Sequence, residues 1–281
     1  MDTSPESNIS LEAGVGPVLE KYPQVERIAV LRGGGLGDLI YTYPALSALK
    51  AAYPGAHVTL LGTPIHKALA ASTEGPVDDV VILPFAKGVR DGDEDPEALA
   101  AFLKDMQARK FDLAIQMHGG GRYSNPFLLK LGARHTVGTR TPDAEHLERN
   151  LDYIYYQNEP DRWFETVGLA GAPTIIPPLL RPKAEYVEAV AGLKDPQRSS
   201  VVVIHPGATD PRRRWPASCF ADAAAGLAAE GAQVLVVGDN SEKALAQEVA
   251  ELARDRVPEG GPGSCPVGGR RTGARRTGGA A

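Results

Sequence analysis

The chain has 281 residues, of which 43% are hydrophobic and 23% charged, and its formal net charge at pH 7 is -5. This is the composition of a globular protein of one large or two ordinary domains, and its mild acidity excludes a whole-protein attraction to nucleic acid or to an anionic membrane. Cys219 and Cys265 are the only cysteines, which argues against a disulfide framework or a cysteine-rich metal site and favours a reducing compartment.

The N-terminal residues contain neither the basic nor the apolar segment of a signal peptide, and no apolar run approaches the ~20 residues of a membrane span. We therefore expect a cytoplasmic protein without a nucleic-acid partner. Peripheral contact with the inner membrane surface stays open. Residues 1–24 are predicted to be a flexible N-terminus.

From residue 25 onwards, short apolar runs alternate with helical patterns, which predicts βαβ units around a parallel sheet. The runs contain Val, Ile and Leu without regular alternation, as in strands covered on both faces. The expected strands cover residues 27–32, 57–61, 79–83, 111–117 and 136–138. The expected helices cover residues 38–52, 64–72, 96–109 and 125–131. The sequence thus predicts an α/β fold whose first domain, residues 25–190, is Rossmann-like and doubly wound.

The pattern changes between residues 143 and 171, a polar and aromatic stretch in which we expect helix and no strand. Its aromatic side chains either pack inside the helical region or stack on a sugar, so the stretch is a candidate wall for an acceptor. These side chains are Tyr153, Tyr155, Tyr156 and Trp163. Residues 175–200, which contain prolines and have a polar end, are predicted to be a connection.

A second, incomplete Rossmann-like domain is predicted over residues 198–256. Its expected elements are a strand at 201–205, the loop PGATDPRRRWP, a helix at 217–230, a strand at 233–237 and a helix at 241–254. Residues 257–281 contain no Leu, Ile, Phe, Tyr or Trp, so they cannot bury enough apolar surface to fold. We expect them to be either a disordered tail or the product of an out-of-frame reading, since GC-rich codons encode Gly, Arg, Ala and Pro.

The glycine-rich segment GGGLGD follows the first expected strand. Gly33 and Gly35 match a dinucleotide fingerprint, but its third glycine is replaced by Asp38 and no acidic residue closes the second strand. The segment also lacks the lysine of a P-loop. Asp38 at the start of a helix is either an N-cap or an acid that faces a ligand, and the two roles are compatible.

Three segments carry a resemblance to a known family. They are RIAVLRGGGLGDLIYTYPALSALKAAYPGAHVTLLG, HPGATDPRRRWP with the helix and strand that follow it, and, more weakly, FDLAIQMHGGGR. Together they resemble glycosyltransferase family 9, the ADP-heptose lipopolysaccharide heptosyltransferases and their relatives. The resemblance implies a GT-B architecture of two facing Rossmann-like domains. It also implies an inverting, metal-independent transfer, without a cofactor, from an ADP-sugar donor to a glycan or glycolipid acceptor.

The resemblance also assigns roles on the acceptor side. By matching position, Asp38 would be the general base that takes the proton of the acceptor hydroxyl. Gly35, Gly37, His118 and Arg122 would lie on the acceptor side or in the loop beside it. From the residues alone, a single histidine at the end of a strand, such as His118, is more often packed or hydrogen-bonded than bound to a ligand.

On the donor side, Arg213 occupies the family's basic position two residues before Trp215. With Arg212 and Thr209 it would bind the donor diphosphate. One guanidinium group can donate two parallel hydrogen bonds to phosphate oxygens, and its charge can replace that of a metal ion at the diphosphate. Without the resemblance, the arginine run would be solvated charge and Thr209 a turn residue.

The chain departs from the family in lacking its later Asp-Ser/Thr-Gly-x-x-His segment, so we expect a member with impaired activity. A non-catalytic sugar-binding or nucleotide-binding pseudoenzyme is an alternative. So is a nucleotide-sugar hydrolase or epimerase of the same fold. Asp91 and Asp93 have the D-x-D form of another glycosyltransferase fold, but we expect them to lie in a solvated acidic loop.

Overall fold

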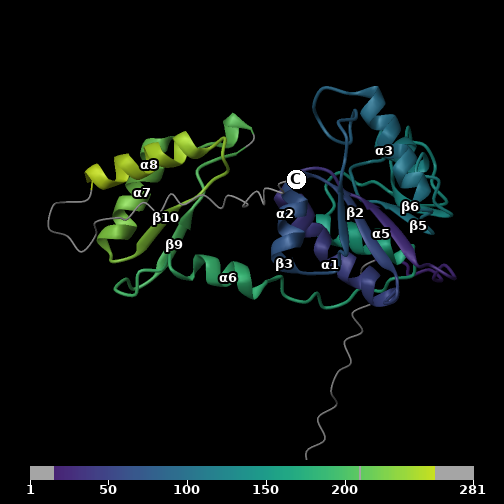
Figure 1. Cartoon of the computed structure of the whole chain (residues 1–281), viewed down its shortest axis with the longest axis horizontal. Helices are drawn as coiled ribbons and strands as arrows, with labels where there is room; N and C mark the ends of the chain where they lie inside the picture. Colours follow the sequence, from purple (N-terminus) through teal and green to yellow (C-terminus); the bar gives the residue numbers. More distant parts are fainter. Residues whose placement is uncertain (1–15, 209, 257–281) are drawn as a thin grey trace, which may run out of the picture. The chain divides into compact units, whose positions relative to one another are not determined.

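The computed structural model describes residues 16–208 and 210–256 (Figure 1). The chain divides into two compact units, Met1–Lys183 and Ala184–Ala281. The division precedes the one expected from the sequence, so that residues 184–190 fall in the second unit.

The described part of the first unit contains a parallel sheet of six strands in the order β4-β2-β1-β5-β6-β7. The strands are β1 (Arg27–Leu31), β2 (His57–Gly62), β4 (Asp79–Ile82), β5 (Leu113–Gln116), β6 (His135–Arg140) and β7 (Arg149–Asp152). The chain adds β2 and β4 on one side of β1, and then β5, β6 and β7 on the other. In sheets of this kind, ligands bind beyond the carboxyl ends of the strands where the order reverses, which here is between β1 and β5.

Helices cover both faces of this sheet, as the sequence predicted. On one face, α1 (Leu36–Ala52) packs against α5 (Glu159–Gly168), and both contribute to a core with the strands. On the other face, α3 (Pro96–Ala108) and α4 (Ser124–Leu129) contribute to a second core. The helix α2 (Pro64–Ser72) follows β2 and coincides with the predicted residues.

The prediction that residues 143–171 contain no strand was wrong, because β7 lies within them. It pairs only with β6 and forms the edge of the sheet. Its sequence, RNLD, has one apolar residue. An edge strand of this composition is not visible as an apolar run, since backbone pairing to β6 rather than burial of side chains defines it.

Two further segments differ from expectation. Residues 16–24, assigned to a flexible N-terminus, pack against the rest of the first unit. Tyr22 is buried, and the Leu19 amide donates to the Gly168 carbonyl at 2.9 Å. The predicted connection 175–200 contains a short strand and a helix. These are β8 (Arg181–Pro182), antiparallel to β3 (Thr73–Glu74), and α6 (Ala184–Ala191).

The described residues of the second unit form the parallel strands β9 (Val201–Ile204) and β10 (Gln233–Val236). The helices α7 (Ala217–Ala229) and α8 (Lys243–Arg256) pack on each other and on these strands through small side chains, mainly alanines. A 3-10 turn, η1 (Pro211–Arg213), lies between β9 and α7. No helix among the described residues is both long and apolar enough to cross a bilayer.

Candidate functional site

The glycine loop joins β1 to α1 at the carboxyl end of β1, beside the point where the strand order reverses. Gly34 has a φ of +89°, and a Cβ on it would lie 2.5 Å from Oδ2 of Asp38. Glycine is required at this position, because any other side chain would meet the carboxylate and strain the backbone. The absence of a side chain at Gly34 therefore lets the Asp38 carboxylate lie against the backbone of the glycine loop.

Asp38 is the third residue of α1, whereas the N-cap is Gly35. The prediction that Asp38 caps the helix was therefore wrong in position, because the helix begins two residues earlier than its sequence pattern indicates. The Asp38 carboxylate instead accepts a hydrogen bond from the Gly35 amide at 2.8 Å through Oδ2. Half of its side chain is exposed, at 51%. An anchored and half-exposed carboxylate can accept a proton from a ligand.

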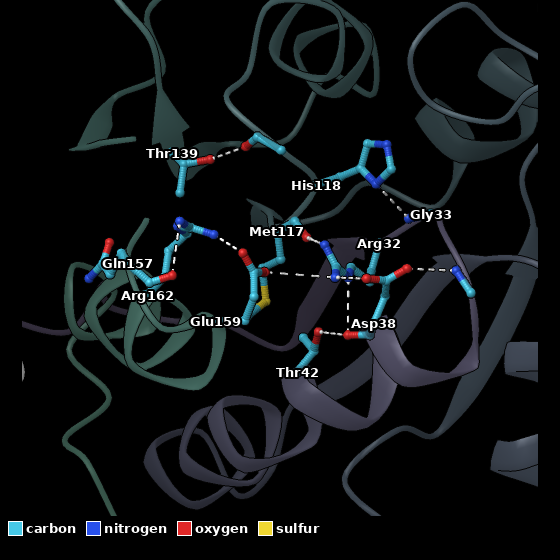
Figure 2. Close-up of polar contacts among 12 residues, drawn as sticks. Arg32, Gly33, Asp38, Thr42, Met117, His118, Thr139, Gln157, Glu159 and Arg162 are labelled. Atoms are coloured by element: carbon cyan, nitrogen blue, oxygen red, sulfur yellow. Dashed lines mark hydrogen bonds and ion pairs between the residues drawn. The ribbon is translucent and has the colours of Figure 1, made fainter. Parts of the chain in front are cut away.

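Arg32, immediately after β1, binds the other carboxylate oxygen. Its Nη2 lies 3.2 Å from Oδ1 of Asp38, and its Nη1 donates to the Met117 carbonyl at 2.8 Å (Figure 2). The guanidinium carbon is 5.0 Å from the centre of the Trp163 ring. Burial lowers the pKa of the Arg32 guanidinium from its ordinary value, and the charge of Asp38 opposes that shift. The buried Arg32 guanidinium thus forms an ion pair with the half-exposed Asp38 carboxylate.

His66, on α2, binds the loop from the other side. Its Nδ1 accepts a hydrogen bond from the Thr63 amide at 3.2 Å, so Nε2 carries the proton and donates to the Gly35 carbonyl at 3.0 Å. The imidazole is fully buried, and burial lowers its pKa below the ordinary 6.5. This arrangement requires neutral histidine, since a protonated Nδ1 cannot accept.

We predict that His66 makes the stability of the first unit depend on pH. Its pKa is lower in the folded than in the unfolded chain, so the unfolded chain binds the proton more readily below pH ~6.5 and stability falls as the pH drops from there towards the folded pKa. Urea unfolding at several pH values should show a shallower decline for His66→Gln than for the wild type. The exposed His57→Gln is the control and should keep the wild-type slope. Equal slopes in all three proteins would contradict the prediction.

His118 follows β5 and completes the surroundings of the loop. Its Nδ1 accepts a hydrogen bond from the Gly33 amide at 3.2 Å (Figure 2), and burial lowers its pKa from 6.5. Gly35 thus lies in the loop and binds Asp38, and His118 contacts the same loop at Gly33. Gly37 lies inside α1, where a Cβ would meet no atom within 4 Å, so nothing there requires a glycine. Arg122 is exposed, and its Nε lies 3.5 Å from Oδ2 of Asp143.

The basic residues of the second unit lie in and beside η1. Arg212 is 89% exposed and is paired with Asp210, its Nη2 lying 2.7 Å from Oδ2. Arg213 is exposed and, among the described residues, forms no ion pair, although its charge adds to the effect of the Arg212 hydrogen bonds in lowering the pKa of Asp210. Thr209 lies outside the described residues.

Several residues of the first-unit site were not predicted. Arg32 could have been found, since a charged residue that closes a buried strand immediately before a glycine loop is unusual. Glu159 and Arg162, one turn apart on α5, form an ion pair, and Nη2 of Arg32 lies 4.0 Å from Glu159 Oε2. Their sequence context is an ordinary helix start, which gives no signal. Within the described ranges, no three His, Cys, Asp or Glu side chains gather in a way that could hold a metal ion.

Comparison with known proteins identifies the family of the chain. The model of glycosyltransferase family 9 (heptosyltransferase) matches residues 99–258, more than half of the chain. The chain belongs to glycosyltransferase family 9. This match confirms the resemblance found in the sequence. It begins after the glycine loop, so it does not extend to Asp38. No curated protein matches the chain.

Solved structures of family members show the same fold. The family 9 glycosyl transferase from Veillonella parvula DSM 2008 superposes with a TM-score of 0.64 and 20% identity, covering 80% of this chain and 66% of that one. ADP-heptose lps heptosyltransferase II from E. coli superposes with a TM-score of 0.60 and 16% identity, covering 81% of this chain and 70% of that one. The E. coli heptosyltransferase WaaC with ADP superposes with a TM-score of 0.56 and 18% identity, covering 80% of this chain and 72% of that one. The chain thus has the predicted α/β fold of GT-B-type glycosyltransferases and spans about two thirds of the length of the first of these proteins.

Proposed function

We propose that this chain is an inverting, metal-independent glycosyltransferase that moves a heptose-like sugar from an ADP-sugar to a glycan or lipopolysaccharide-type acceptor. Membership of family 9 is the observation that carries the proposal. We also propose a cytoplasmic location, with peripheral contact at the inner membrane surface, because the acceptor would be a glycolipid.

In this proposal Asp38 is the general base. A direct displacement at the sugar's anomeric carbon needs a single base within hydrogen-bond reach of the attacking hydroxyl. Asp38 supports this role because its carboxylate is half exposed and anchored by Gly35 and Arg32 at the carboxyl end of β1. A carboxylate oxygen can accept two hydrogen bonds, so both oxygens of Asp38 retain capacity for a hydroxyl.

The donor diphosphate would bind to Arg213, with Arg212 and Thr209 beside it. The leaving diphosphate gains negative charge as the glycosidic bond breaks, and a guanidinium stabilises that charge. Arg212 would have to exchange Asp210 for phosphate oxygens, whereas Arg213 has no such partner among the residues that the structure describes. The solved complex of WaaC with ADP supports ADP as the nucleotide of the donor.

Isothermal titration with ADP tests the donor site. We expect Arg213→Ala to raise the Kd by about 10- to 100-fold, the cost of one hydrogen bond to a charged group. Arg254→Ala, at an exposed position of α8, is the matched control and should leave the Kd unchanged. Equal affinity in both variants would remove Arg213 from the donor site. Micromolar binding by the wild type would contradict the expectation of an impaired donor site, and no binding by a folded wild type would argue against donor recognition by this unit.

A further inference from the structure

Four side chains of the first unit form a series of alternating charge, Asp38, Arg32, Glu159 and Arg162 (Figure 2). Nη2 of Arg32 lies 3.2 Å from Asp38 and 4.0 Å from Glu159, and Nη1 of Arg162 contacts the same Glu159 carboxylate. The series joins the start of α1 to the start of α5. Its residues are distant in the chain and are brought together by the packing of these two helices.

The two cations of the series are buried and the two carboxylates are partly exposed. The Arg32 side chain is 6% exposed and that of Arg162 is fully buried. A surface ion pair contributes little, but a buried guanidinium whose nitrogens all have acceptors has a fixed orientation. Arg32 meets this condition, because Nη1 donates to Met117 and Nε donates to the Asp38 carbonyl at 3.3 Å. The position of its Nη2 is therefore fixed before any ligand arrives.

Arg162 extends the series to the loop that follows β7. Its Nη2 donates to the carbonyl of Ile154, and it lies 3.5 Å from that of Gln157. Its guanidinium carbon is 4.3 Å from the centre of the Tyr153 ring. The loop between these residues carries the exposed side chains Tyr155 and Tyr156. The contacts that hold Glu159 and Arg162 thus do not involve Asp38, whereas Arg32 contacts both Glu159 and Asp38.

We propose that Arg32 is a positioning residue that sets the orientation of the Asp38 carboxylate, and that Glu159 holds Arg32 in place for it. This inference rests on the proposed role of Asp38 as the base. Stabilisation alone is a weaker explanation, because burying a charged group costs as much as an ion pair returns. Orientation accounts for the observation that each carboxylate oxygen has its own donor, the Arg32 side chain at Oδ1 and the Gly35 amide at Oδ2.

Kinetics of Arg32→Ala test the role in transfer. We expect kcat to fall about 100-fold, the effect of a misplaced catalytic group, while the KM for the donor stays unchanged. Guanidinium ions added to the variant should restore part of the lost rate by filling the vacated site. The control is Arg109→Ala, which removes an Arg–Asp pair of similar length, 3.1 Å to Asp79, beside α3. It should retain the wild-type kcat.

The amide proton of Gly35 tests the positioning without any activity, because it donates to Asp38. In NMR spectra of Arg32→Ala, we expect this resonance to move towards its position in Asp38→Asn and its hydrogen exchange to accelerate, while Arg109→Ala leaves both unchanged. If Arg32→Ala does not fold, Glu159→Gln decides by the same readouts, with a smaller shift expected. A folded variant with an unchanged Gly35 resonance and unchanged kcat would overturn the inference. If the wild type transfers no sugar, the proposed function fails, and the Gly35 resonance still decides whether Arg32 positions Asp38.

Discussion

Replacing Asp38 by Asn is expected to lower the rate of sugar transfer by about 10²- to 10⁴-fold, the contribution of general-base catalysis, with little change in the affinity for ADP. Asn has nearly the shape of Asp and retains an oxygen that can accept from the Gly35 amide, so the loop should keep its conformation. It cannot take a proton from an acceptor hydroxyl. Steady-state transfer rates and ADP titrations on the same preparation measure the two quantities.

Asp93→Asn is the control for this experiment, because Asp93 is an exposed carboxylate of the acidic loop before α3. It should transfer sugar at the wild-type rate. If Asp38→Asn kept that rate and lost only thermal stability, Asp38 would be a structural residue of the loop and the proposed mechanism would be wrong. If neither protein nor the wild type transferred sugar while all bound ADP, the chain would be a nucleotide-binding protein rather than an enzyme.

Replacing Trp163 by Ala is expected to lower the free energy of unfolding by about 3–5 kcal/mol, the usual cost of removing a large aromatic side chain from a core. Trp163 is fully buried on α5, among the apolar side chains of the core that α1 covers. The substitution would also remove the ring whose centre lies 5.0 Å from the Arg32 guanidinium carbon. Urea unfolding followed by circular dichroism measures the change, as long as unfolding is two-state.

The matched control for Trp163 comes from the same aromatic stretch. Tyr155 is 76% exposed, and Tyr155→Ala should change the free energy of unfolding by no more than about 0.5 kcal/mol. Equal effects of the two substitutions would contradict the assignment of Trp163 to the core. The burial of Trp163 also corrects its place in the candidate acceptor wall, since a ring without exposed surface cannot stack on a sugar. Tyr155 and Tyr156 remain candidates for that role.

Local signals predicted most of the fold. The proline that begins α2 and the threonine before it specify the start of a helix within a few residues, and its predicted bounds, Pro64–Ser72, agree with the structure. The strands β1, β2 and β5 are apolar runs covered on both faces, which composition alone reveals. By contrast β7 has no such run and exists because it pairs with β6.

In the candidate site, too, some features have a local signal in the sequence and others depend on tertiary packing. The sequence determined that a carboxylate, Asp38, follows a glycine loop at the end of a strand, because loop, glycines and acid are neighbours in the chain. Only the tertiary structure placed Arg32 against its Oδ1, His66 against the Gly35 carbonyl and Glu159 behind Arg32. These contacts depend on how α1, α2 and α5 pack, and packing of distant segments has no periodic signal in a sequence.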